Sequence, residues 1–108
     1  MSTIPSVSAD TFDEEVLRSE GTTLVEFWAE WCGPCRAVTP VLEHIAAEEH
    51  PGFRIVKINS DDNPEVTERY RVLSIPTMKV FKGGEVVKTL VGAKPSAAIK
   101  AELAPYLV

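Results

Sequence analysis

The sequence predicts an α/β fold, with a mixed central β-sheet and helices on both of its faces. Within the first 70 residues, short apolar runs typical of buried strands alternate with segments of helical periodicity. That order favours parallel strands joined by right-handed crossovers. Near the C-terminus, two apolar runs are separated only by Lys82–Glu85 (KGGE), a hairpin signal that adds antiparallel strands. At 108 residues, we expect one domain spanning positions 1–108.

The N-terminal part begins with an extended piece at Ile4–Val7 and a helix over Ala9–Ser19. Asp10 is a candidate cap for that helix, and Gly21 ends it. The next apolar run, Thr22–Ala29, predicts a buried strand.

A longer helix follows and ends near Glu49. Pro40 lies inside it and should kink it, because proline lacks the backbone donor and crowds the carbonyl four residues back. Its apolar residues recur at helical spacing and predict one buried face: Val38, Val41, Leu42, Ile45 and Ala46.

The second half continues the alternation and ends on a helix. Asn63 is the expected cap of a short helix that has proline at its first position. The predicted elements are a strand at Phe53–Asn59, a helix at Pro64–Tyr70, strands at Thr77–Phe81 and Val86–Val91, and a helix from Pro95 to Leu103.

Composition and charge narrow the function classes. Lys and Arg total 11 against 16 for Asp and Glu, a net charge of -5, which disfavours a nucleic-acid binder that needs a basic face. No apolar run reaches the roughly 20 residues that span a bilayer. The N-terminus lacks the basic and apolar regions of a secretory signal, so we expect a cytoplasmic protein.

The chain has two cysteines, Cys32 and Cys35, in the stretch WCGPC. A zinc site usually needs four ligands, and His44, nine residues beyond Cys35, would lie roughly 13 Å along the helix. A metal site is therefore disfavoured. A purely structural disulfide is disfavoured too, because closing so short a ring removes little unfolded-state entropy.

A redox role remains for the pair. Cys32 lies at the mouth of the predicted helix, with Pro34 at the first helical position, so backbone amides and the helix dipole favour its thiolate and lower its pKa. We expect Cys35, one turn further in, to be more buried and to stay protonated. Cys32 then attacks a substrate disulfide and Cys35 resolves the mixed disulfide, while Gly33 and Pro34 set the turn.

These residues resemble the thioredoxin family over essentially the whole chain. The matching stretches are FWAEWCGPCR, SIPT, FKGGE and Val91-Gly92. The resemblance implies a thioredoxin fold with a five-stranded mixed sheet and four α-helices. It implies protein-disulfide reduction through a redox-active Cys32–Cys35 disulfide, with no bound cofactor or metal. It also implies electrons from NADPH through thioredoxin reductase and disulfide-containing protein substrates. We expect a monomer and, from the charge and the apolar runs, no nucleic-acid or membrane partner.

Two charged residues interrupt predicted strands. Glu26 is either a partly exposed strand carboxylate or a buried acid with a raised pKa that takes the proton from Cys35 during resolution. The family's usual pattern has aspartate here, so the longer Glu26 is a departure. Lys57 is either an exposed strand lysine or, as the resemblance implies, an electrostatic partner of that acid.

The resemblance also implies a substrate surface. The Ile75-Pro76 bond is expected to be cis and to present backbone groups of Ile75 to an extended substrate by strand addition. Trp28 should pack under the cysteine loop. A flat apolar patch is expected around an exposed sulfur of Cys32, formed by Trp31, Gly33, Pro34, Ile75, Pro76, Gly92 and Ala93.

Other functions fit the same fold. An oxidase or isomerase is a sibling of the reductase, and the Gly-Pro between the cysteines favours the reductase by resemblance. A binding or scaffold subunit without redox work is a different class. Replacing both Cys32 and Cys35 with serine separates these classes, because it should abolish disulfide reduction and spare a scaffold.

Overall fold

The computed structural model describes residues 4–107, so both ends of the predicted 1–108 domain lie outside the described residues. These residues contain one sheet of five strands: β1 (Ser6–Val7), β2 (Thr22–Trp28), β3 (Phe53–Asn59), β4 (Thr77–Lys82) and β5 (Glu85–Val91). The strand order is β1-β3-β2-β4-β5. The first three strands run parallel, and β4 and β5 each run antiparallel to the preceding neighbour in that order.

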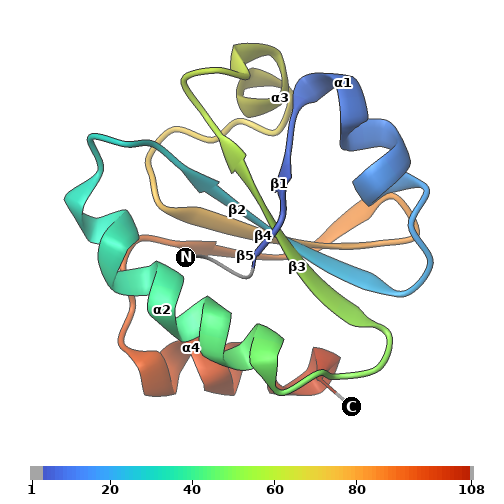
Figure 1. Ribbon diagram of the computed structural model, residues 1–108, viewed down its shortest axis with the longest axis vertical. Helices are drawn as coiled ribbons and strands as arrows, with labels where there is room; N and C mark the ends of the chain where they lie inside the picture. The colour runs from blue at the N-terminus through green and yellow to red at the C-terminus, as the bar shows by residue number, and fades with distance from the viewer. Residues whose placement is uncertain (1–3, 108) are drawn as a thin grey trace.

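Helices cover both faces of this sheet (Figure 1). Within residues 4–107 the α-helices are α1 (Ala9–Phe12), α2 (Gly33–Ala47), α3 (Pro64–Arg69) and α4 (Ser96–Leu103). Helices α2 and α4 lie on one side of the sheet, and α1 and α3 on the other. A 3-10 turn at Ala104–Tyr106 follows α4. The predicted mixed five-stranded sheet with four helices is confirmed.

The apolar core is divided between the two faces. The cluster against α2 and α4 includes Leu24, Leu42 and Ile99, and the cluster against α1 and α3 includes Phe12, Phe27 and Phe81. The second cluster contains an edge-to-face ring pair, with centroids 5.6 Å apart for Phe12 and Phe81.

Strand β2 is the centre of the molecule. It lies between β3 and β4, and six of its seven residues are buried. Side chains alternate along a strand, so Leu24 and Glu26 point toward α2, whereas Val25 and Phe27 point toward α1. Glu26, which interrupts the apolar sequence of β2, therefore places its carboxyl in the interior beside α2.

The first helix begins at the predicted Ala9, but its cap residue and its end differ from the prediction. It begins after Ser8, whose backbone N–H donates to Thr11 Oγ1 at 3.0 Å, so Asp10 is a first-turn residue and not the cap. Its second half is a π-helix over Asp13–Leu17, in which the Arg18 N–H donates to the Asp13 carbonyl at 2.9 Å. The helical segment ends at Leu17, two residues before the predicted Ser19.

Asn63 occupies the predicted cap position of α3, but its side chain caps a different helix. Its Oδ1 accepts from the Ala9 N–H at 2.8 Å, and its Nδ2 donates to the Asn59 carbonyl at 2.9 Å. Asn63 is itself buried. It therefore satisfies one of the free amides in the first turn of α1 and ties that helix to the end of β3.

Strand β3 has its predicted bounds, and the ends of the other elements match the prediction or differ by one or two residues. Helix α2 continues through Pro40 and ends at Ala47, two residues before the predicted end near Glu49, and His50 lies beyond it. His50 is half-buried and contacts the Leu107 carbonyl through Nδ1 at 3.1 Å. The hairpin loop is Gly83–Gly84, whose φ angles of 61° and 81° suit a tight turn that glycine adopts at low cost.

Candidate active site

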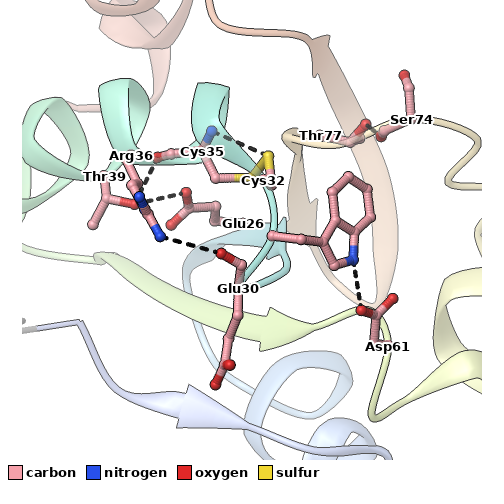
Figure 2. Close-up of a disulfide and its surroundings, with 10 residues drawn as sticks. Glu26, Glu30, Cys32, Cys35, Arg36, Thr39, Asp61, Ser74 and Thr77 are labelled. Atoms are coloured by element: carbon pink, nitrogen blue, oxygen red, sulfur yellow. Dashed lines mark hydrogen bonds between the residues drawn. A yellow bond between two sulfur atoms is a disulfide. The ribbon is translucent and has the colours of Figure 1, made fainter.

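The cysteine pair lies where β2 leads into α2 (Figure 2). Cys32 and Cys35 form a disulfide. Cys32 is the N-cap residue of α2, and the Cys35 N–H donates to its Sγ at 3.1 Å. Pro34 lies in the first helical turn, where its missing donor leaves no hydrogen bond unmade. The expected amide pointing at the Cys32 sulfur is therefore present, and it favours a thiolate there.

The exposure of the two cysteines differs from what was expected. Cys32 is 2% exposed and Cys35 is 4% exposed, so Cys32 does not present an open sulfur and Cys35 is not the more buried of the two. In the disulfide, the two residues pack with Ala29, and Trp28 and Ile75 lie against this group. Both residues of the disulfide are therefore enclosed.

Glu26 is fully buried, with 0% of its surface exposed, so the exposed-carboxylate alternative is wrong. Its register neighbours are Lys57 on β3 and Met78 on β4. The carboxyl points toward α2, where Oε2 accepts a hydrogen bond from Thr39 Oγ1 at 3.1 Å (Figure 2). Its Oε1 is buried and has no hydrogen-bond partner among the described residues.

Burial raises the pKa of the Glu26 carboxyl above its usual value. The hydrogen bond from Thr39 and then the charge of Lys57 oppose that rise, and the charge of Glu43 adds to it. The net shift is upward because removal from water outweighs one hydrogen bond and one half-buried cation. A carboxyl in this environment can hold a proton closer to neutral pH than an exposed glutamate can.

Lys57 and Trp28 pack against each other near Glu26. The Lys57 ammonium lies 5.3 Å from the centre of the Trp28 ring, within cation–π range. Both side chains are half-buried, and Trp28 packs against the cysteine pair as expected. Lys57 is therefore neither an exposed strand lysine nor a direct ion-pair partner of Glu26 in the structure.

A cavity of about 470 Å³ lies beside the disulfide. Trp28, Cys35, Thr39 and Lys57 are among the residues that line it. It brings solvent-accessible space to Cys35 and to the residues that surround Glu26.

The predicted substrate surface is assembled in part. The Ile75-Pro76 peptide bond is cis, as expected, and the Pro76 carbonyl accepts from the Gly92 N–H at 2.8 Å. Ile75 packs against the disulfide. These contacts bring the loops before β4 and after β5 beside the cysteines, although Pro76 itself is buried and contributes little exposed area.

Exposed parts of the patch come from the cysteine loop and its neighbours. Gly33, Pro34 and Ala93 are exposed, and Gly92 is half-buried with a φ of 87° that favours glycine. Trp31 is 70% exposed, and its Nε1 donates to Asp61 Oδ2 at 2.7 Å (Figure 2).

Three residues of this region were missed by the sequence analysis. Leu73 is 95% exposed and shares a shallow pocket with Trp31, and Asp61 holds the Trp31 indole. No local pattern singles out either of them. Thr39 is different, because it lies four residues after Cys35 in a helix, and that spacing places both on one face.

Two further features are absent from the described part of the chain. Residues 4–107 contain no cluster of three or more His, Cys, Asp or Glu side chains that is arranged to hold a metal ion. No helix within those residues is both long and apolar enough to cross a bilayer.

Comparison with known proteins gives a consistent result. Residues 3–105 match the family model named Thioredoxin. The chain is 57% identical over 97 residues to a thioredoxin of Streptomyces clavuligerus, which covers 89% of each chain. It is 46% identical over 107 residues to a thioredoxin of Synechocystis sp., covering 99% of this chain and 100% of that one. A bifunctional thioredoxin reductase/thioredoxin of Mycobacterium leprae is 47% identical over 97 residues, which are 90% of this chain and 21% of that protein.

Proposed function

The chain belongs to the thioredoxin family and is a thiol-disulfide oxidoreductase, and we propose how its residues divide the reduction of protein disulfides. Cys32 is the attacking nucleophile and Cys35 is the resolving thiol. The observation that carries this assignment is the Cys35 N–H directed at Cys32 Sγ at 3.1 Å, because it stabilises negative charge on Cys32. Gly33 and Pro34 keep this turn in place.

Two displacements reduce the substrate. The Cys32 thiolate attacks one sulfur of a substrate disulfide, and the electron pair of the broken bond leaves on the other substrate sulfur. Deprotonated Cys35 then attacks Cys32 Sγ, which expels the second substrate sulfur as a thiolate. Both substrate thiolates take protons, so the substrate gains two electrons and two protons. The chain keeps the Cys32–Cys35 disulfide.

Glu26 is the general base for the second displacement. A carboxylate in its position accepts the Cys35 proton, and its raised pKa matches it to that task better than an exposed glutamate. The cavity beside Thr39 and Lys57 then allows the proton to pass to water. Lys57 moderates the charge of Glu26, and Trp28 supports the loop from below.

Substrates bind across the cysteine end of the molecule. Backbone groups of Ile75, before Pro76, pair with an extended substrate segment, and Gly92 and Ala93 line the same approach. Trp31 supplies apolar contact area, with its ring held by Asp61. The shape suits varied segments, because main-chain pairing does not depend on the substrate's side chains.

Electrons reach the chain from outside. We infer that NADPH reduces the Cys32–Cys35 disulfide through a separate thioredoxin reductase, and that the chain works as a single cytoplasmic domain and a monomer. A reductase and a thioredoxin are joined in one protein in the relative from Mycobacterium leprae, which supports such a partnership.

Insulin reduction tests the proposal. The purified chain is mixed with insulin and dithiothreitol, and turbidity is followed as reduced insulin chains precipitate. We expect strong acceleration that is lost when Cys32 and Cys35 are both replaced by serine. A folded wild-type chain that gave no acceleration would overturn the proposal and favour a scaffold.

A further inference from the structure

The hydroxyl of Thr39 faces two hydrogen-bond acceptors at once. Oγ1 lies 3.1 Å from Glu26 Oε2 and 3.0 Å from the Cys35 carbonyl oxygen. A hydroxyl carries one proton and can donate only one hydrogen bond, while its oxygen can also accept. In Figure 2, the Thr39 side chain lies between the Glu26 carboxyl and the backbone of Cys35.

An ordinary role explains only half of this geometry. Threonine in a helix often donates to the carbonyl four residues back, and the contact with Cys35 is of that kind. That habit does not account for the Glu26 carboxyl, which comes from a different element. Thr39 is the only hydrogen-bond partner of that carboxyl among residues 4–107, since Glu26 Oε1 has none.

The two acceptors match the two protonation states of Glu26. When Glu26 is ionised, Thr39 donates to Oε2. When Glu26 carries a proton, the carboxyl donates to Thr39 Oγ1, and the Thr39 proton turns to the Cys35 carbonyl. Glu26 Oε2 and Thr39 Oγ1 are thus hydrogen-bonded to each other in both states, and only the bond from Thr39 Oγ1 to the Cys35 carbonyl changes.

We propose that Thr39 is a positioning residue that holds the Glu26 carboxyl in both protonation states by rotating its hydroxyl between Glu26 and the Cys35 carbonyl. This inference rests on the proposed role of Glu26 as the base for Cys35. Glu26 must be ionised to accept the proton. The inference names Thr39, on the same helix as the resolving thiol, as the residue that stabilises this ionised state.

No other described group that faces Glu26 can replace Thr39 as a hydrogen-bond donor to the ionised carboxylate. Lys57 on β3 is directed over the Trp28 ring, and Glu43 on α2 carries the same charge as Glu26. On β4, the register neighbour is the uncharged Met78. Cys35, on α2, is the proton donor itself. Removing the Thr39 hydroxyl should therefore leave the ionised carboxylate without any hydrogen bond from the described residues.

Thr39→Val tests the inference, because valine keeps the shape and removes the hydroxyl. The first readout is resolution, followed with an aromatic disulfide that releases one coloured thiolate on attack and a second on resolution, across pH 5.5 to 9. We expect the first release to be unchanged. The second should be roughly tenfold slower on its acid side and should converge with wild type at high pH, since a charged-state hydrogen bond is lost.

Matched variants exclude a merely structural effect. Thr39→Ser keeps the hydroxyl and should restore the wild-type pH profile to within about threefold. Thr39→Ala removes it with a smaller side chain and should behave like valine. In a Glu26→Gln background, Thr39→Val should have no further effect, because the group it positions is absent.

A second readout does not depend on activity. Carbon NMR of the oxidised protein follows the titration of the Glu26 carboxyl, which Thr39→Val should move to higher pH and Thr39→Ser should not. An unchanged titration overturns the inference. If Glu26→Gln slows resolution while Thr39→Val matches wild type, the inference fails and the base assignment stands. If Glu26→Gln resolves at the wild-type rate, the base assignment fails, and the NMR titration alone decides the Thr39 contact.

Discussion

Two glutamates near opposite ends of helix α2 have pKa values shifted in opposite directions. Glu26 packs against its N-terminal half and is fully buried, and burial raises its pKa. Glu48 is the C-cap residue and is exposed, and a hydrogen bond with His50 lowers its pKa. The side-chain chemistry is the same, so the environment alone separates them.

The contrast between Glu26 and Glu48 shows which region of the fold contains a destabilising group. A buried carboxylate with one hydrogen bond and one unpartnered oxygen opposes folding at neutral pH. The Glu48–His50 contact, 2.9 Å long, favours folding weakly because water screens it. The unfavourable arrangement is found beside the cysteines and the weakly favourable one away from them, which is the distribution expected of a functional site.

The largest effect should come from the N-terminal end of α2. Cys35→Ser should abolish catalytic turnover of insulin, because the mixed disulfide at Cys32 then has no resolving thiol and accumulates. Mass spectrometry of the trapped adduct measures this. His44→Gln, an exposed change further along the same helix, is the control and should leave turnover unchanged. Full turnover by the Cys35 variant would contradict the view that catalysis depends on the N-terminal end of α2 and not on its C-terminal end.

Glu26→Gln should slow resolution at pH 7 by about a hundredfold, the lower range of general acid–base contributions, without destabilising the fold. The amide has nearly the same size and cannot accept the Cys35 proton. Stopped-flow measurement of the second thiolate release gives the rate. Wild-type rates between pH 6 and 8 would remove Glu26 from the mechanism.

The same variant should change how stability depends on pH. The folded pKa of Glu26 is raised, so its unfavourable contribution is absent below the unfolded pKa of about 4.3, grows as pH rises through the folded pKa, and is complete above it. Glu26→Gln should therefore be more stable than wild type by about 1–3 kcal/mol at pH 8 and nearly equal at pH 4. Urea unfolding of the oxidised proteins measures this, and a difference independent of pH would contradict it.

Glu48→Gln should give the smallest effect. Its folded pKa is lowered, so any stabilisation is present above the unfolded pKa and is lost as pH falls through the folded pKa. We expect unchanged insulin turnover and a slight loss of stability at pH 7 that disappears in high salt, measured by urea unfolding. A change in turnover would mean that the two ends of α2 are coupled.

The fold was largely predictable from the sequence, because its signals are local. Apolar periodicity located β3 at its observed bounds, and paired glycines located the hairpin. The predicted boundaries differ mainly at helix ends. The π-turn over Asp13–Leu17 and the contact of His50 with the Leu107 carbonyl beyond the end of α2 have no signature in their own segments.

The site was predictable to a lesser degree. Glu26 was noticeable because a charge interrupts an apolar strand, and its burial follows from the central place of β2. The partner of its carboxyl, Thr39, depends on how β2 and α2 pack. The exposure of Leu73 and the bond between Trp31 and Asp61 depend on loop paths that periodicity does not describe. The burial of Cys32 was not predicted, because it depends on how the whole disulfide packs against Ala29, Trp28 and Ile75.

The side chain of Asn63 has a consequence for how the chain is made. Synthesis on the ribosome proceeds from the N-terminus, so α1 emerges early, yet the cap of its Ala9 amide comes from a residue 54 positions later. Until that residue appears, this amide lacks its partner within the chain. The first helix to be translated therefore gains this cap only after β2, α2 and β3 have been made.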